Sequence, residues 1–150
     1  MKVGDVCTRR VIIIEKNETV QEAAKLMRQH HVGDVVVVER HDGKNHPVGI
    51  LTDRDIVVEL LAEKVDLDAV TIGDAMSYEL LTIKESDDLT DTLKRLSRKG
   101  VRRAPVVAED GNLAGVVSAD DLIEVFAELL RDLTMLISRE QTREQLARSD

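Results

Sequence analysis

One stretch of this sequence occurs twice, and it decides the fold that we predict. The stretch GILTDRDIVVELL runs from Gly49 to Leu61, and a looser copy, GVVSADDLIEVFAELL, runs from Gly115 to Leu130. In both copies an apolar run ends in Thr or Ser, and an Asp follows three residues later at the start of a helical pattern. This recurrence indicates an internal duplication.

The rest of the chain repeats in step with these two copies. The offset between equivalent positions is 69 residues early in the repeat and 66 at Gly49 and Gly115. The difference of three residues lies in a loop that contains Gly and Asp. This loop spans 39–48 in the first repeat and 108–114 in the second, and surface loops accept such changes in length. Positions 69 apart that match are Asp5 and Asp74, Thr8 and Ser77, Ile14 and Ile83, and Val32 and Val101.

Each repeat predicts the element order β-α-β-β-α. Short apolar runs at 11–16 and 80–85 precede helical patterns at 18–30 and 88–100, and two further apolar runs and a closing helix follow. An Asp-Gly turn between the last two strands predicts an antiparallel hairpin, and the helix after the first strand predicts a crossover. The apolar helix positions are Val20, Ala23, Ala24 and Met27 in the first repeat, and Leu89, Leu93 and Leu96 in the second.

The predicted fold class is α/β (α+β), with two small units that each have one apolar sheet face. Because a unit of roughly 60 to 70 residues is marginal alone, we expect the two sheets to pack face to face. We place the first repeat at residues 1–66, the second at 67–130 and a C-terminal helical extension at 131–150.

The last helical pattern runs from Ser118 to Asp150 without Pro or Gly. An apolar stripe on such a helix requires a cover, either the same helix of a second copy or a partner protein. Beyond Ile137 the sequence is polar, and we expect it to be solvated or frayed. The stripe comprises Leu122, Val125, Phe126, Leu129, Leu130, Leu133, Leu136 and Ile137.

Composition favours a globular cytoplasmic protein. Of 150 residues, 43% are apolar and 33% are charged, and the net charge is −8. No apolar run approaches the roughly 20 residues that span a bilayer, and the N-terminus lacks a signal-peptide pattern, so we expect no membrane association. The acidic balance and the lack of aromatic residues beyond Tyr78 and Phe126 argue against nucleic-acid binding.

Cysteine and histidine usage excludes two further kinds of site. Cys7 is the lone cysteine, so the chain has no internal disulfide. We expect no metal site, because no Cys or suitably spaced carboxylate accompanies the four histidines, His30, His31, His41 and His46.

The order of these motifs resembles a tandem pair of cystathionine-β-synthase (CBS) domains, the arrangement called a Bateman module. The resemblance covers roughly residues 1 to 130 and leaves no catalytic domain over. It implies two repeats packed sheet to sheet as a pseudo-twofold pair. The residues that carry it are VGDVCTRRVIII (3–14), IGDAMSYELLTI (72–83), HHVGDVVVV (30–38), KGVRRAPVV (99–107) and the two stretches quoted first.

The repeated Ser/Thr-x-x-Asp motif has two interpretations. Thr52 with Asp55, and Ser118 with Asp121, fit capping boxes in which Asp takes the role of Glu, and spacing alone favours this interpretation. The same groups suit a nucleotide, because a helix N-terminus and a hydroxyl favour a phosphate and a carboxylate accepts ribose hydroxyls. In CBS pairs that this chain resembles, the motif binds adenosine nucleotides, so the resemblance places ligand binding ahead of simple capping for at least one copy.

The resemblance also implies two clefts, each with an apolar adenine slot from one repeat and the Ser/Thr-x-x-Asp motif from the other. The arginine-rich cleft comprises Ser77, Leu80, Leu81, Val101, Arg102 and Arg103 with Thr52, Arg54 and Asp55. The acidic cleft comprises Thr8, Val11, Ile12, Val32, Gly33 and Asp34 with Ser118 and Asp121. For the apolar members taken alone, ordinary core packing explains them better.

The two clefts differ in charge. Arg54, Arg102 and Arg103 suit a phosphate, because arginine pairs with phosphate oxygens in a bidentate fork. The acidic cleft has Asp34 at the position of Arg103 and Asp120 at that of Arg54, and carboxylates repel a phosphate. We therefore predict one competent site, the arginine-rich cleft, and a weak or empty acidic cleft. Arg102 and Arg103, each taken singly, are explained equally well as surface charges.

No residue pattern indicates an enzyme. The chain has no nucleophile with a base and an orienting group, no phosphate-binding loop and no dinucleotide glycine fingerprint. The resemblance to CBS pairs implies instead a regulatory, signal-transducing module that binds AMP, ADP or ATP, with AMP or ATP favoured, and that needs no other cofactor. It would pass the bound state to its own homodimer or to an unidentified protein target. The alternative is a structural or oligomerisation module with no nucleotide ligand.

Overall fold

The computed structural model describes residues 1–76 and 79–149, and its elements follow the predicted order twice. The first half contains β1 (Ile13–Glu15), α2 (Val20–His30), β2 (Asp34–His41), β3 (Lys44–Thr52) and a closing helix that begins as α3 (Asp53–Asp55) and continues as the π-helix η1 (Ile56–Leu61). The second half contains β4 (Ile83–Lys84), α5 (Leu89–Lys99), β5 (Arg103–Val107), β6 (Leu113–Ser118) and α6 (Ala119–Ala147). Two short helices, α1 (Val3–Val6) and α4 (Ile72–Ala75), precede the two halves.

Each half forms a three-stranded sheet, in the order β1-β2-β3 and β4-β5-β6. The first two strands of each sheet are parallel and the last two are antiparallel. The β2–β3 turn has positive φ at Asp42 (51°) and Gly43 (75°), which suits the twist of a two-residue hairpin. The predicted crossover and hairpin are therefore confirmed in both repeats.

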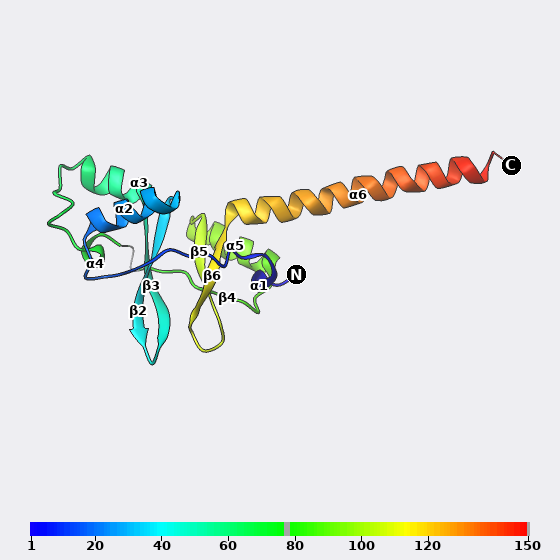
Figure 1. Ribbon diagram of the computed structural model, residues 1–150. Helices are drawn as coiled ribbons and strands as arrows, with labels where there is room; N and C mark the ends of the chain where they lie inside the picture. Colours follow the sequence, from blue (N-terminus) through cyan, green and yellow to red (C-terminus); the bar gives the residue numbers. More distant parts are fainter. Residues whose placement is uncertain (77–78, 150) are drawn as a thin grey trace.

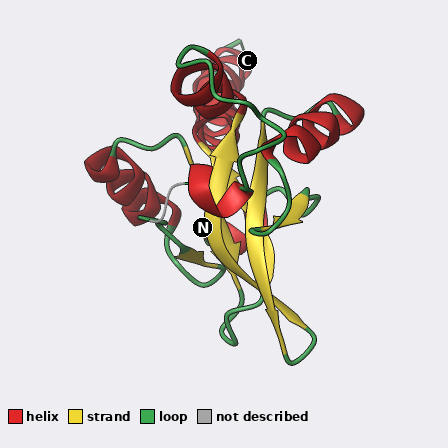
Figure 2. Cartoon of the chain, turned by 90° about the vertical axis from the view of Figure 1, so that its left-hand side faces the viewer, coloured by secondary structure: helices red, strands yellow, loops and turns green. Residues whose placement is uncertain are grey.

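The two sheets pack against each other in the middle of the molecule, and the helices cover their outer faces (Figure 2). Strand β3 lies against β6. At the hairpin ends, Lys44 Nζ lies 2.9 Å from Asp110 Oδ2, and the Asn45 N–H donates to Asn112 Oδ1 at 2.9 Å. Because equivalent strands meet, a pseudo-twofold axis relates the halves, as predicted.

Each sheet is buried on both faces, whereas the sequence pattern predicted one apolar face. Val35 and Val37 belong to a core cluster that includes the buried face of α2. Val36 and Val38 are also buried, and strand alternation places them on the opposite face, toward the second sheet. The inner faces therefore supply the contact between the halves.

The short segment before each repeat packs on the other half of the molecule. Val3 and Cys7 belong to the core cluster of the second half, and the Val3 N–H donates to the Asp87 carbonyl at 3.0 Å. Ile72 belongs to the core of the first half, and its N–H donates to the Glu18 carbonyl at 2.8 Å. Burial raises the pKa of the Cys7 thiol, which makes its reactive thiolate scarcer at neutral pH.

The buried face of α5 differs in one residue from the predicted one. Leu89 and Leu96 are buried, but Leu93 is 40% exposed. Thr92 is fully buried in its place. Positions 89, 92 and 96 lie on one side of a helix, so the face that meets the sheet is rotated by one residue from the leucine pattern.

Helix α6 has 29 residues and projects from the rest of the molecule toward the C-terminus (Figure 1). The predicted continuous helix is confirmed as far as Ala147. Beyond Ile137 its residues are exposed, which agrees with the solvated alternative and not with the frayed one. Within α6 only Leu122 is buried, and the stripe from Phe126 to Ile137 is exposed. Among the described residues, no helix combines the length and apolar character that a membrane span needs.

Candidate functional site

A cavity of about 570 Å³ lies where the two halves meet at the closing helix of the first half. This volume falls within the roughly 300–1,000 Å³ of small-molecule sites. The structure brings together every described residue that we assigned to the arginine-rich cleft, and Ser77 lies outside the described residues. The predicted lining residues are Thr52, Arg54, Asp55, Leu80, Leu81, Val101, Arg102 and Arg103.

Four further residues line this cavity that sequence reasoning did not assign: Ile50, Asp53, Glu79 and Gly100. Ile50 had a usable signal, because it lies two residues before Thr52 on β3 and strand alternation places both on one face. Gly100 directly follows α5 and has a φ of 66°. It lines the cavity because the chain continues from it into Val101 and Arg102, which line the same cavity.

A smaller cavity of about 200 Å³ matches the acidic cleft, and it falls below the usual size range. Gly33 does not line it, because its backbone faces the start of the closing helix, where its carbonyl accepts the Asp53 N–H at 2.9 Å. Arg10, Asp120 and Val116 line it in addition, and Arg103 lines both cavities. The predicted members present are Thr8, Val11, Ile12, Val32, Asp34, Ser118 and Asp121.

Both copies of the repeated motif form capping boxes. Thr52 Oγ1 accepts the Asp55 N–H at 3.1 Å, and Asp55 Oδ2 accepts the Thr52 N–H at 3.0 Å. Ser118 and Asp121 make the same two bonds at 3.2 and 2.8 Å. The capping interpretation of the spacing is therefore confirmed in both repeats.

The two capping carboxylates differ in how many of their oxygen atoms already accept a hydrogen bond. Asp55 lines the larger cavity, and its Oδ1 atom has no hydrogen-bond partner within residues 1–76 and 79–149, so no described protein group competes there with a ligand donor. Asp121 uses both oxygens, because Oδ2 accepts the Ser118 hydroxyl at 2.7 Å and Oδ1 accepts the Thr8 hydroxyl at 3.4 Å. A ligand hydroxyl at the acidic cleft would have to displace these bonds.

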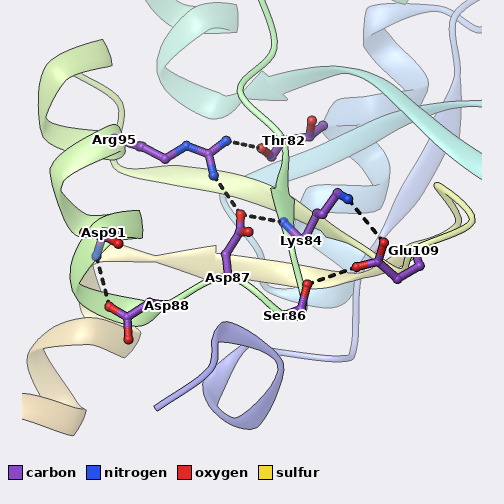
Figure 3. A network of polar contacts seen from close by, with 8 residues as sticks. All are labelled: Thr82, Lys84, Ser86, Asp87, Asp88, Asp91, Arg95 and Glu109. Atoms are coloured by element: carbon purple, nitrogen blue, oxygen red, sulfur yellow. Dashed lines mark hydrogen bonds and ion pairs between the residues drawn. The ribbon is translucent and has the colours of Figure 1, made fainter.

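A polar network holds the segment that supplies the apolar wall of the arginine-rich cleft (Figure 3). Arg95 on α5 donates to the Thr82 carbonyl at 2.9 Å and to Asp87 Oδ2 at 2.7 Å. Asp87 Oδ2 also accepts the Lys84 N–H at 3.0 Å. Because Thr82 directly follows Leu81, these bonds fix the end of the segment that carries Leu80 and Leu81.

The three arginines of the larger cavity are paired to different degrees. Arg54 has no carboxylate within ion-pair distance among the described residues and is exposed. Arg102 Nη2 lies 3.4 Å from Asp120 Oδ1, and both side chains are largely exposed. Arg103 forms an ion pair with Asp34 that is partly buried. Two carboxylates of the acidic cleft, Asp34 and Asp120, thus partly neutralise Arg103 and Arg102.

The four histidines lie at the end of α2 and in the first hairpin. His31 ends α2 in the left-handed conformation, with a φ of 55°, at the position that Gly100 takes after α5. The rings of His41 and His46 lie 5.9 Å apart in the first hairpin. No group of three His, Cys, Asp or Glu residues in the described part of the chain is placed to hold a metal ion.

Two βαββα halves around a pseudo-twofold axis, with a cleft built from both, define the class of paired CBS modules. The family model for the CBS domain matches residues 3–62 and 72–128, and the chain belongs to this family.

Known proteins resemble this chain in sequence and in fold. An uncharacterized protein of Methanopyrus kandleri is 36% identical over 125 residues, which cover 83% of this chain and 62% of that protein, so this chain spans less than two thirds of that relative. The CBS domain pair of protein MJ0100, solved with 5-methylthioadenosine and S-adenosyl-L-methionine, has a TM-score of 0.73 at 25% identity, with 85% of this chain and 97% of that one covered. A hexameric CBS-CP12 protein from bloom-forming cyanobacteria also has a TM-score of 0.73 at 25% identity, with 82% and 66% covered.

Proposed function

We propose that this protein is a ligand-sensing regulatory module that binds an adenine nucleotide in the arginine-rich cleft. The observation that carries the proposal is the meeting, in one cavity of about 570 Å³, of an open carboxylate oxygen on Asp55, apolar residues and three arginines. The MJ0100 domain pair, which shares the fold, was solved with two adenosine compounds. That complex supports an adenosine moiety as the common part of the ligand.

Each part of the cavity suits one part of a nucleotide. Asp55 Oδ1 can accept a ribose hydroxyl, since the other oxygen is already held by the helix cap. Leu80, Leu81 and Val101 offer apolar surface for adenine. The three arginines can pair directly with phosphate oxygens, while Asp53, Asp55 and Glu79 line the same cavity, so the match to AMP, ADP and ATP depends on direct arginine contacts and not on net positive charge. We assign the module a binding role and not a reaction, because none of the described residues that line the cavity is a nucleophile held by a base.

A thermal-shift series tests this function against a purely structural module. The native protein is melted with AMP, ADP, ATP, NAD or S-adenosylmethionine at several concentrations. A ligand that binds only the native state stabilises it by about 2.7 kcal/mol at one hundred times its Kd, so AMP or ATP should raise the Tm with concentration. An unchanged Tm with every compound would favour the structural module.

Calorimetry on two matched variants tests which cleft binds. Asp55→Asn and Asp121→Asn each alter the same position of a capping box, and Asp121→Asn in addition changes the acceptor of the Thr8 and Ser118 hydroxyls, so the Tm of each variant is measured beside its affinity. Because hydrogen bonds to a charged group contribute about 1.5–3 kcal/mol, Asp55→Asn should weaken AMP and ATP binding by about tenfold or more. Asp121→Asn should leave it within about twofold. Equal losses in the two variants would contradict the assignment to the arginine-rich cleft.

We further propose that the bound state is passed on through α6 to a second copy of the chain. The apolar stripe of this helix is exposed in the single chain, and a related CBS protein is hexameric. A nucleotide can shift the assembly only if it binds the two arrangements of the protomers with different affinity. A different protein that covers the same stripe is the other outcome, and the self-association experiment described below separates the two.

A further inference from the structure

The first residues of β2 and β5 form an ion pair across the pseudo-twofold axis. Asp34 and Arg103 are 69 positions apart, which is the repeat offset, so they are equivalent residues of the two halves. A duplicated fold brings such positions together near its axis, and here the duplicated residue carries opposite charges. The pair is partly shielded from water, with side-chain exposures of 18% for Asp34 and 31% for Arg103.

This pair connects the two cavities. Arg103 lines both of them, whereas Asp34 lines the acidic cleft only. The second pair that crosses between the clefts, Arg102 with Asp120, is 77% and 70% exposed, so solvent screens it. Within the described part of the chain, the Asp34–Arg103 pair is therefore the stronger electrostatic link between the clefts.

An anion in the arginine-rich cleft must compete with Asp34 for the same guanidinium. Arginine recognises a phosphate best when its planar fork faces two oxygens at once. In the unliganded chain Asp34 Oδ1 already engages the Nη1 atom of that fork, and an uncharged adenosine does not need the guanidinium. Removing the Asp34 charge should therefore help phosphorylated ligands selectively.

We infer that Asp34 is a specificity-determining residue of the arginine-rich cleft, although it lines only the other one. It holds Arg103 and so weakens the binding of anionic nucleotides relative to uncharged adenosine. A phosphate that takes Arg103 leaves Asp34 unpaired in a cavity whose described residues also include Asp120, Asp121 and one other cation, Arg10, so three carboxylates then stand against one guanidinium. The acidic cleft then repels a second anion, so each chain binds one anionic nucleotide. This inference rests on the proposed nucleotide function.

Calorimetry with ATP and adenosine on a double-mutant cycle tests the inference. Asp34→Asn should tighten ATP binding by about fivefold or more, within the usual range of coupling between sites, and leave adenosine within about twofold. Arg103→Gln should weaken ATP binding, and adding Asp34→Asn to it should change nothing further, because the competitor then has no target. Asp34→Glu keeps the carboxylate and should stay close to the unmodified protein.

The control is Asp110→Asn, which removes another ion pair between the halves, that with Lys44 at 2.9 Å, at a site that lines neither cavity. It should leave both ligands unaffected. If the unmodified chain binds ATP but Asp34→Asn leaves the ATP affinity unchanged, lowers it, or tightens adenosine equally, the role of Asp34 is overturned and the nucleotide function stands. If neither the unmodified chain nor any variant binds AMP, ADP, ATP or adenosine, both proposals are overturned.

Discussion

Asp55 combines a role in the fold with the ligand-binding role that we propose for it. Its Oδ2 atom closes the capping box with Thr52, while Oδ1 remains open at the cavity. Capping and nucleotide binding, which compete as explanations of the sequence motif, are therefore compatible in this copy. In the second copy the Thr8 hydroxyl and the Ser118 hydroxyl occupy both oxygens of Asp121. The difference between the copies arises from neighbours that are distant in sequence.

Thr92 gives a prediction at the same scale. The residue is fully buried on α5, and its Oγ1 atom has no hydrogen-bond partner among the described residues. A buried hydroxyl without a partner costs about 1–3 kcal/mol, and valine has nearly the same shape without it. We expect Thr92→Val to raise the free energy of unfolding by about 1 kcal/mol, measured by urea denaturation.

Thr90→Val is the matched control. Thr90 lies two residues earlier on α5, is exposed, and its hydroxyl donates to the capping residue Asp88 at 2.5 Å. This substitution removes an existing hydrogen bond, so it should leave the free energy of unfolding unchanged or lower it. A loss of stability in Thr92→Val equal to that in Thr90→Val would mean that the buried hydroxyl is satisfied after all.

At the scale of the element, α6 carries an exposed apolar stripe that a partner would have to cover. Its first twelve residues, 119–130, contain acidic side chains and no Lys or Arg. Residues 131–148 contain four arginines and three acidic residues, a net charge of +1. An antiparallel pair of α6 helices would set the acidic half of one copy against the arginines of the other. A parallel pair would place like charges side by side.

The stripe of α6 gives a test of self-association. Leu130 is 63% exposed at the centre of the stripe, and a Glu there would have to be desolvated in a helix pair. We expect Leu130→Glu to weaken the dimer by more than about tenfold, in sedimentation-velocity runs over a range of concentrations. Met135→Glu is the control, because Met135 is 44% exposed but lies about 140° around the helix from Leu130.

Two results would contradict the self-association proposal. The first is an unmodified chain that sediments as a monomer at every concentration, which leaves the stripe to a different protein. The second is an equal effect of Leu130→Glu and Met135→Glu, which would place the contact on another face of the helix.

At the scale of the whole molecule, the exchange of the short segments makes the two halves depend on each other. Val3 is fully buried in the core of the second half, although it precedes the first repeat. We expect Val3→Ala to lower the free energy of unfolding by about 2 kcal/mol, because it removes two buried methyl groups and leaves a small cavity. The transition should remain single in calorimetry, since both halves share cores and an interface.

Leu146→Ala serves as the control for this prediction, because Leu146 is 68% exposed near the end of α6. It should change stability by less than about 0.5 kcal/mol. Two separate transitions in the Val3→Ala protein, with only one of them shifted, would contradict the interdependence of the halves.

The sequence by itself determined the element order and the duplication. Period-two and helical patterns and the Asp-Gly turns report local backbone preferences, which neighbouring residues impose. The offsets of 69 and 66 residues between matching positions report the duplication. The same local chemistry predicted both capping boxes, since Thr52 and Asp55 are only three residues apart. Local patterns also predicted the long helix from Ser118 onward, although they left open whether its polar end is a solvated helix or frayed.

Only the tertiary structure decided which residues meet across the halves. The ion pair between Asp34 and Arg103 joins positions 69 residues apart, and no local pattern distinguishes that contact from two surface charges. The burial of Thr92 in place of Leu93 likewise depends on how α5 is rotated against its sheet. The physical reason is that periodicity fixes which side chains share a face, whereas packing of the two sheets and of the exchanged segments fixes what that face contacts.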